Sequence, residues 1–235
     1  MRAIILTAGK GERLKGLVDT VPKPMVPIGG RPILQHNIEW LRGHGVTDIY
    51  INLHHLAHRV IDHFDDGTRF GVRITYSYEK DLLGTAGAVR KIADEFREFQ
   101  DVDMFLVVHG DNQVNYNLKK VIAFHHAHNG MGTIVLYRKD DVSRSRIVVL
   151  DSAGRVMRFI EKPKEEEHVS SLVNTGVYIL NRDTLRYIPE GESLDFGREV
   201  FPRMLKCGEA LYGIEVSGRL IAMDTPDLFR AALED

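Results

Sequence analysis

The residue types that could bind a phosphorylated ligand lie near the start of the chain, directly after a short apolar run. The apolar residues 3–6 predict a buried parallel strand. Residues 8–13, Ala-Gly-Lys-Gly-Glu-Arg, then supply glycines, which let backbone N–H groups approach an anion, and cations, which neutralise its charge. Lys23 follows between Pro22 and Pro24, whose fixed φ angles stiffen the backbone. This spacing predicts a phosphate site at the end of the first strand.

Two well-known phosphate-binding loops do not match this stretch. A Walker A loop requires Ser or Thr after its Gly-Lys pair, whereas Lys10 is followed by Gly11. The dinucleotide fingerprint requires a third glycine where this chain has Leu14, and no helical pattern follows at once. The stretch is therefore not typical of a P-loop NTPase or of a dinucleotide-dependent oxidoreductase.

A candidate metal-binding carboxylate, Asp111, lies after a second apolar run, residues 104–108. Open α/β sheets bind ligands at the carboxyl ends of their strands, so we expect Asp111 and the Gly9 loop to face one crevice. Mg²⁺ prefers one or two carboxylates together with phosphate oxygens, which makes Asp111 a candidate ligand. The simpler alternative, for Gly-Asp-Asn taken alone, is a solvated turn.

The segment 83–87, Leu-Gly-Thr-Ala-Gly, is a candidate surface for the base of a nucleotide. Its small residues could let a planar ring lie against the backbone, while Thr85 and backbone groups hydrogen-bond the edge of the ring. The alternative is a glycine-rich helix start with Thr85 as its N-cap.

Hydrophobic periodicity predicts the elements that position these residues. In the first half, strands are predicted at 48–53, 72–76, 104–108 and 132–137, and helical stripes at 33–41, 56–64, 88–96 and 118–122. This alternation predicts an α/β fold with a mostly parallel sheet.

The second half has a different pattern. Strand-like segments are predicted at 146–150, 156–161 and 172–180, followed by helices at 196–205 and 227–233, with Asp195 as the N-cap of the first helix. We expect a β-rich elaboration that forms the far wall of a cleft.

The composition bounds the class of protein. With 235 residues, 43% hydrophobic and 27% charged, the chain fits a single soluble globular domain. No apolar run approaches the roughly 20 residues of a membrane span, and the start lacks a signal-peptide pattern, so a cytoplasmic protein with no membrane partner is expected. The single cysteine, Cys207, excludes an internal disulfide, and a net charge of −2 argues against broad nucleic-acid binding.

The first loop resembles the nucleotide-binding loop of the sugar-1-phosphate nucleotidylyltransferases, whose pattern is L-x-[AG]-G-x-G-x-R-L followed by P-K-P-x-x-P. Residues 6–14 and 22–27 match both parts. The segment 83–87 is similar to the L-G-T-A-G of the mannose-1-phosphate and heptose-1-phosphate guanylyltransferases. Residues 161–163 are similar to the family's E-K-P motif, and Asn174 lies in a match to its N-[TA]-G-[VIL]-Y strand. The resemblance covers nearly the whole chain.

This resemblance implies a Rossmann-like three-layer α/β fold with a mixed, mostly parallel central sheet and a β-rich acceptor-binding elaboration. Residues 1–235 would form one nucleotidyltransferase domain, with 1–130 mainly binding nucleotide and 131–235 mainly binding sugar phosphate. The implied reaction joins a nucleoside triphosphate, with GTP favoured, to a sugar 1-phosphate, and releases pyrophosphate with Mg²⁺ as cofactor. The family commonly assembles as homo-oligomers.

The resemblance also implies roles for individual residues. Catalysis is expected from Arg13, Lys23, Asp111 and Lys162. The nucleotide is expected to bind Ala8, Gly9, Gly11, Arg13, Lys23, Gly84 and Thr85. The acceptor is expected to bind Glu161, Lys162, Asn174 and Arg146, and the metal to bind Asp111 and Asp224.

Two positions depart from the family's pattern. Arg146 stands where the family's Y-G-V-V has glycine, so the acceptor is expected to carry extra negative charge or to differ from a simple hexose phosphate. The family's D-x-G-T-P has a metal ligand where this chain has Ala222, and Asp224 is the expected substitute because residues i and i+2 of a strand point to one face. The alternative function is a weak or inactive paralogue that binds a sugar nucleotide as a regulatory effector.

Overall fold

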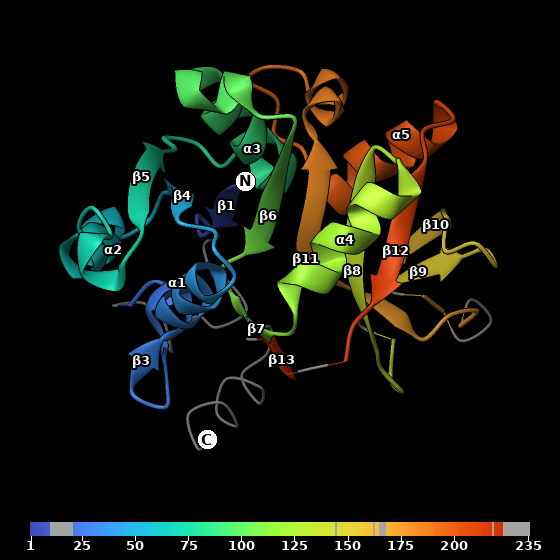
Figure 1. The fold of residues 1–235 in the computed structure, drawn as a ribbon, viewed down its shortest axis with the longest axis horizontal. Coiled ribbons are helices and arrows are strands. Elements are labelled where there is room, and N and C mark those ends of the chain that lie inside the picture. The colour runs from blue at the N-terminus through green and yellow to red at the C-terminus, as the bar shows by residue number, and fades with distance from the viewer. Residues whose placement is uncertain (10–20, 144, 162, 165–167, 218, 223–235) are drawn as a thin grey trace.

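A mixed β-sheet forms the centre of the molecule (Figure 1). The computed structural model describes residues 1–9, 21–143, 145–161, 163–164, 168–217 and 219–222. Within these residues the central sheet has nine strands: β1 (Arg2–Leu6), β4 (Asp48–Leu53), β5 (Arg73–Tyr78), β6 (Met104–His109), β8 (Gly132–Arg138), β9 (Arg146–Leu150), β10 (Val156–Glu161), β11 (Leu172–Asn181) and β12 (Leu211–Glu215).

The first half of the chain builds the parallel part of the sheet, in the order β6-β1-β4-β5. Leu6, the last residue of β1, lies in register with Asn52 on β4 and with His109 on β6. The residues that follow these strands therefore emerge at one edge, which is where the sequence predicts the ligand.

The second half builds the antiparallel part. Strand β11 pairs with β6, β8 and β9, β10 forms the outer edge beside β9, and β12 returns parallel to β8. The predicted mixed sheet and β-rich second half are confirmed.

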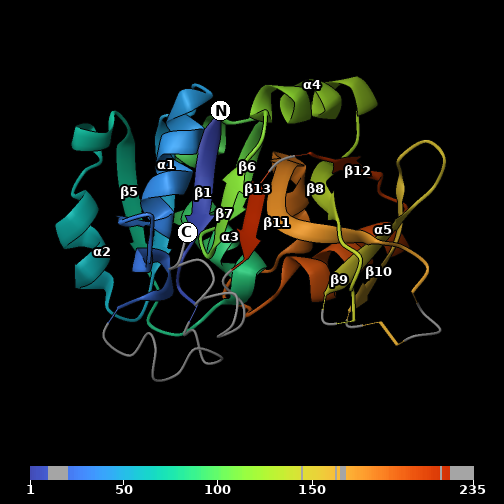
Figure 2. The same ribbon diagram turned by 90° about the horizontal axis from the view of Figure 1, so that it is seen from below.

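Helices cover both faces of the sheet because its strands are apolar on both sides. Ile5 packs in a cluster with α1 (Ile33–Gly43), α2 (Ala57–Phe64) and α4 (Leu118–His128), whereas the adjacent Ile4 packs in a cluster with α3 (Gly84–Glu95) and α5 (Phe201–Lys206). Figure 2 shows α1 and α4 on one side of the sheet and α3 and α5 on the other. The expected three layers are present.

Short elements complete the described chain. The 3-10 helices are η2 (Lys23–Met25), η3 (Thr68–Phe70), η4 (Arg97–Asp101) and η6 (Arg182–Tyr187). Two small antiparallel sheets pair β2 (Pro27–Ile28) with β3 (Arg31–Pro32), and β7 (Asn112–Asn115) with β13 (Arg219–Ala222).

Two predicted helices differ from the structure in their bounds. Helix α3 begins at Gly84, earlier than the periodicity of residues 88–96 indicates. The helix predicted at 196–205 is divided into a π-helical turn, η7 (Phe196–Val200), and α5. Pro202 in the first turn of α5 lacks the N–H that would continue the upstream hydrogen-bond ladder.

The predicted helix 227–233 lies outside the described residues. No helix in the described part of the chain is long and apolar enough to cross a membrane.

Candidate active site

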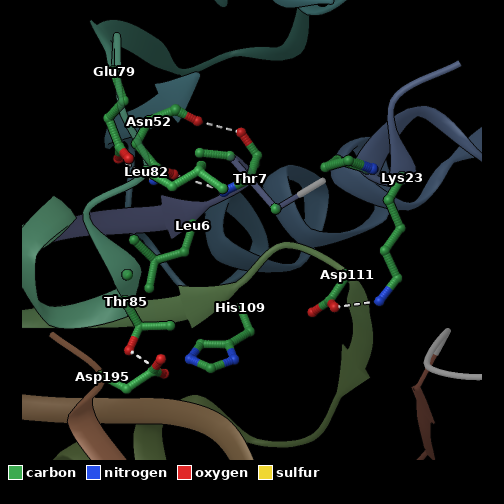
Figure 3. Close-up of a pocket in the computed structure, with 14 residues that line it drawn as sticks. Leu6, Thr7, Lys23, Asn52, Glu79, Leu82, Thr85, His109, Asp111 and Asp195 are labelled. Atoms are coloured by element: carbon green, nitrogen blue, oxygen red, sulfur yellow. Dashed lines mark hydrogen bonds and ion pairs between the residues drawn. The ribbon is translucent and has the colours of Figure 1, made fainter. Parts of the chain in front are cut away.

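A cavity of about 200 Å³ opens at the carboxyl edge of the parallel strands (Figure 3). Residues from the ends of β1, β4, β5 and β6, from η2 and from the first turn of α3 form its walls. The lining residues are Leu6, Thr7, Ala8, Gly9, Lys23, Pro24, Asn52, Glu79, Leu82, Gly84, Thr85, His109, Asp111 and Asp195.

The structure brings predicted residues from three separate segments to this cavity. They are Ala8, Gly9, Lys23, Gly84, Thr85 and Asp111. Gly11, Arg13, Lys162 and Asp224 lie outside the described residues.

Lys23 and Asp111 form an ion pair at one side of the cavity, with Lys23 Nζ 2.5 Å from Asp111 Oδ2. The η2 turn positions Lys23, because the Met25 N–H donates to the Pro22 carbonyl at 2.7 Å. Burial alone would raise the pKa of Asp111, but the Lys23 ammonium, with a smaller contribution from His109, lowers this pKa below its ordinary value. Asp111 is therefore ionised at neutral pH, and a cation and a carboxylate face the same space.

A buried polar network that the sequence analysis missed lies beside these residues. Asn52 Oδ1 accepts from the Thr7 N–H at 2.6 Å, and the Thr7 hydroxyl donates to the Asn52 carbonyl. Asn52 Nδ2 donates to Glu79 Oε1 at 2.7 Å, and Glu79 Oε2 accepts from the Leu83 N–H at 3.1 Å. The network joins the ends of β1, β4 and β5 to the start of α3. The sequence contained one signal for this network: a polar residue stands at the end of each of two apolar strands, Thr7 after β1 and Asn52 in β4.

The first turn of α3 is fastened to the second half of the chain through Gly84. Gly84 has φ +69°, and a Cβ there would lie 2.5 Å from the Leu194 carbonyl oxygen. The same oxygen accepts from the Ala86 N–H at 2.8 Å. The glycine is thus required by backbone conformation and by close packing against residue 194.

Thr85 is not an N-cap, which was the alternative for it, whereas Asp195 occupies the predicted N-cap position of η7 without capping through its side chain. The N-cap of α3 is Leu83, and Asp195 makes no side-chain cap hydrogen bond to η7. Instead the Thr85 hydroxyl donates to Asp195 Oδ1 at 3.0 Å and accepts from the Phe196 N–H at 2.9 Å. The Thr85 hydroxyl therefore joins the first turn of α3 to the start of η7.

The described acceptor candidates, Arg146, Glu161 and Asn174, lie at one end of the antiparallel strands, and none of them lines the cavity. Arg146, the first residue of β9, lies in register with Glu161, the last residue of β10. On β11, Asn174 Nδ2 donates to the Tyr178 hydroxyl at 2.9 Å.

Strand β13 brings the chain back beside Asp111. Its last residue, Ala222, lies in register with Asn112 on β7. The backbone at Ala222 is therefore next to the candidate metal carboxylate.

Comparison with known proteins identifies the family. A family model described as nucleotidyl transferase matches residues 2–219. The chain belongs to the nucleotidyl transferase family. The resemblance predicted from the loop motifs is confirmed.

Relatives of this nucleotidyl transferase family member carry names for different bases and sugars. The chain is 36% identical to a UTP–glucose-1-phosphate uridylyltransferase of Synechocystis sp., over 98% of the chain and 62% of the relative. It is 35% identical to a mannose-1-phosphate guanyltransferase of Saccharomyces cerevisiae, over 97% of the chain and 63% of the relative. The chain thus spans less than two thirds of the length of these relatives.

Solved structures in the family share the fold over almost their whole length. HddC from Yersinia pseudotuberculosis, complexed with GMP-PN, is 25% identical with a TM-score of 0.83, covering 99% of this chain and 98% of that one. A glucose-1-phosphate thymidylyltransferase named as putative, from Bacillus anthracis, in complex with a sucrose, is 25% identical with a TM-score of 0.87, covering 100% of this chain and 94% of that one.

Proposed function

We propose that this nucleotidyl transferase joins a nucleoside triphosphate to a sugar 1-phosphate, forming an NDP-sugar and releasing pyrophosphate. The observation that carries the proposal is the Lys23–Asp111 ion pair at the cavity on the carboxyl edge of the parallel strands. The names of the relatives, which all join a nucleotide to a sugar 1-phosphate, support it.

The proposed chemistry needs no nucleophile from the protein. A phosphate oxygen of the sugar 1-phosphate attacks the α-phosphorus of the nucleotide in line, and the bond between the α-phosphorus and the bridging oxygen of pyrophosphate breaks. Catalysis then consists mainly of positioning and charge stabilisation. Lys23 neutralises the triphosphate and the departing pyrophosphate, with Arg13 proposed for the same role. Lys162 is proposed to hold the phosphate of the acceptor, and Glu161 and Asn174 its sugar.

Asp111 has the chemistry of a Mg²⁺ ligand. Its carboxylate is ionised and lines the cavity, and Mg²⁺ sites use one or two carboxylates plus phosphate oxygens rather than a cage of protein ligands. Among the described residues no group of three acidic, His or Cys side chains could form such a cage. Asp111 would hold the ion, together with Asp224 by proposal. The bound ion would neutralise phosphate charge.

GTP is the proposed donor, bound mainly by residues 1–130, and residues 131–235 mainly bind the acceptor. The guanyltransferase relatives and the structure solved with GMP-PN support a guanine nucleotide. Because the Synechocystis relative is named for UTP, UTP is the most important nucleotide to compare with GTP as a donor.

Pyrophosphate release from the purified protein tests this function. The four ribonucleoside triphosphates and dTTP are each combined with a panel of sugar 1-phosphates in the presence of Mg²⁺. We expect release with at least one pair, fastest with GTP. Tight binding of a sugar nucleotide without release from any pair would instead support the regulatory paralogue.

The ion pair gives a residue-level test. We expect Lys23→Ala and Asp111→Asn each to lower kcat by on the order of 10²–10³, as for a removed transition-state contact. Lys91→Ala is the matched control, because it removes a lysine from a 2.6 Å ion pair with Glu95 that lies away from the cavity. Near-full turnover in either site variant would show that the site is wrongly assigned.

A further inference from the structure

Arg146 lies where three strands of the proposed acceptor side end together. It is the first residue of β9 and pairs in register with Glu161, the last residue of β10. The next residue of β9, Ile147, pairs with Val173 on β11, which directly precedes Asn174. The three positions with a proposed acceptor role therefore lie at the same end of the antiparallel strands.

The Arg146 guanidinium lies against Gly197. A Cβ at Gly197 would lie 2.5 Å from Arg146 Nη1 and 2.8 Å from Cζ. Gly197 belongs to the π-helical turn η7 and is buried, and its φ is outside the left-handed region. The guanidinium thus fills the space that a side chain at position 197 would occupy.

Gly197, against which the guanidinium lies, is two residues from Asp195 in the chain. The pKa of Tyr178 is raised to about 12: burial raises it most, the hydrogen bond with Asn174 and the charge of Arg146 lower it, and the charge of Asp195 raises it. Asn174 therefore hydrogen-bonds the buried Tyr178 hydroxyl, and the charges of Arg146 and Asp195 both act on it. Asp195 itself lines the cavity.

We propose that Arg146 selects sugar 1-phosphates whose sugar carries a second anionic group, either a carboxylate or a phosphate. This inference rests on the proposed function and specifies its acceptor. A guanidinium presents five N–H donors in one plane and binds a carboxylate or phosphate through two parallel hydrogen bonds. A neutral sugar hydroxyl cannot accept in this way, so a cation held at this point favours an acceptor with added negative charge.

Matched pairs of acceptors test the selection. Glucose 1-phosphate is compared with glucuronic acid 1-phosphate and with glucose 1,6-bisphosphate, and the mannose and galactose series are compared likewise. The readout is kcat/KM for pyrophosphate release with the donor nucleotide held constant. We expect an anionic member to be preferred by at least about tenfold, the effect of one charged hydrogen bond. The arms with carboxylate and phosphate show which anion is selected.

Two variants locate the preference in the guanidinium. Arg146→Gln should remove the preference for the anionic acceptor. It should lower kcat/KM for the acceptor with the second anionic group roughly 10- to 100-fold, mainly by raising KM, and change kcat/KM for the acceptor with an uncharged sugar by less than about threefold. Gly197→Ala keeps Arg146 but places a methyl group where the guanidinium lies, so it should reduce the same preference. Arg158→Gln, which removes an exposed cation from β10, is the control and should leave the preference unchanged.

The outcomes separate this inference from the proposed function. Equal turnover of neutral and anionic acceptors by the wild-type protein, or an equal loss for both in Arg146→Gln, would overturn the role of Arg146 and leave the proposed function standing. Absence of pyrophosphate release with every donor and acceptor would overturn both.

Discussion

The hydroxyl of Thr85 lies at the point where the two halves of the chain meet. It donates to Asp195 Oδ1 and accepts from the Phe196 N–H, so its hydrogen-bonding capacity is directed at the second half of the chain. The side chain still borders the cavity, and its methyl group and backbone remain the parts suited to contact a base.

Replacing this hydroxyl should affect stability more than base preference. Thr85→Val keeps the shape of the side chain but removes both hydrogen bonds and leaves the Phe196 N–H without its acceptor. We expect the free energy of unfolding to fall by about 1–3 kcal/mol, measured by urea denaturation. The ratio of GTP to UTP turnover should stay unchanged. Thr85→Ser, which keeps the hydroxyl, is the control. A changed nucleotide ratio in a fully stable Thr85→Val protein would show instead that the hydroxyl recognises the base.

At the scale of elements, the contact between α3 and residue 194 determines how the first turn of α3 is held. The Leu194 carbonyl accepts from the Ala86 N–H, and the Leu194 N–H donates to the Leu83 carbonyl at 2.9 Å. The Ala86 and Gly87 N–H groups in the first turn of α3 are thereby satisfied by the chain segment that leads into η7, and the Leu83 side chain makes no cap hydrogen bond.

A methyl group at Gly84 should separate these two elements. Gly84→Ala forces a left-handed φ on alanine and places Cβ against the Leu194 carbonyl, so we expect the free energy of unfolding to fall by about 2–4 kcal/mol. Gly208 has φ +83° with no atom near its Cβ position, so Gly208→Ala isolates the conformational part, about 1–2 kcal/mol. Equal losses in the two variants, measured by urea denaturation, would mean that the contact with Leu194 contributes little.

The sequence predicted the central elements because their signals are local. The runs in β1, β4 and β6 are apolar, and the stripe in α1 has helical spacing, so strand and helix follow from a few neighbouring residues. The pairing of β7 with β13 joins residues about a hundred positions apart and has no local signal.

The candidate site was likewise predictable only where a local motif marks its residues. The Lys23 and Asp111 segments were recognisable as motifs, whereas Asn52 and Glu79 became visible only once their strands were adjacent. Asp195 takes the N-cap position predicted for it. The hydrogen bond between its side chain and Thr85 could not be predicted, because it forms only when folding brings Phe196 against α3.

At the scale of the whole molecule, His125 ties a covering helix to the antiparallel part of the sheet. It lies on α4 with only 5% of its surface exposed. Its Nδ1 is 2.9 Å from Thr133 Oγ1 on β8, and its Nε2 is 3.0 Å from Asn181 Oδ1 at the end of β11. Burial lowers the pKa of His125, the hydrogen bond with Asn181 raises it, and His126 lowers it, with a net shift below its ordinary value.

Because of this lowered pKa, we expect His125 to make the free energy of unfolding depend on pH. Between the folded pKa and the unfolded pKa of about 6.5 the unfolded chain binds more protons, so the stabilisation is complete above about pH 6.5 and is lost as pH falls through the folded pKa. Urea unfolding of the wild type and of His125→Gln from about pH 5 to pH 8 measures it. Relative to the variant, the wild type should lose up to about 1.4 kcal/mol per pH unit on acidification, because the other titrating groups cancel in the difference. If the free energy of unfolding depends on pH in the same way in the two proteins, His125 has its ordinary pKa in the folded molecule. The packing of α4 would then not require a neutral imidazole.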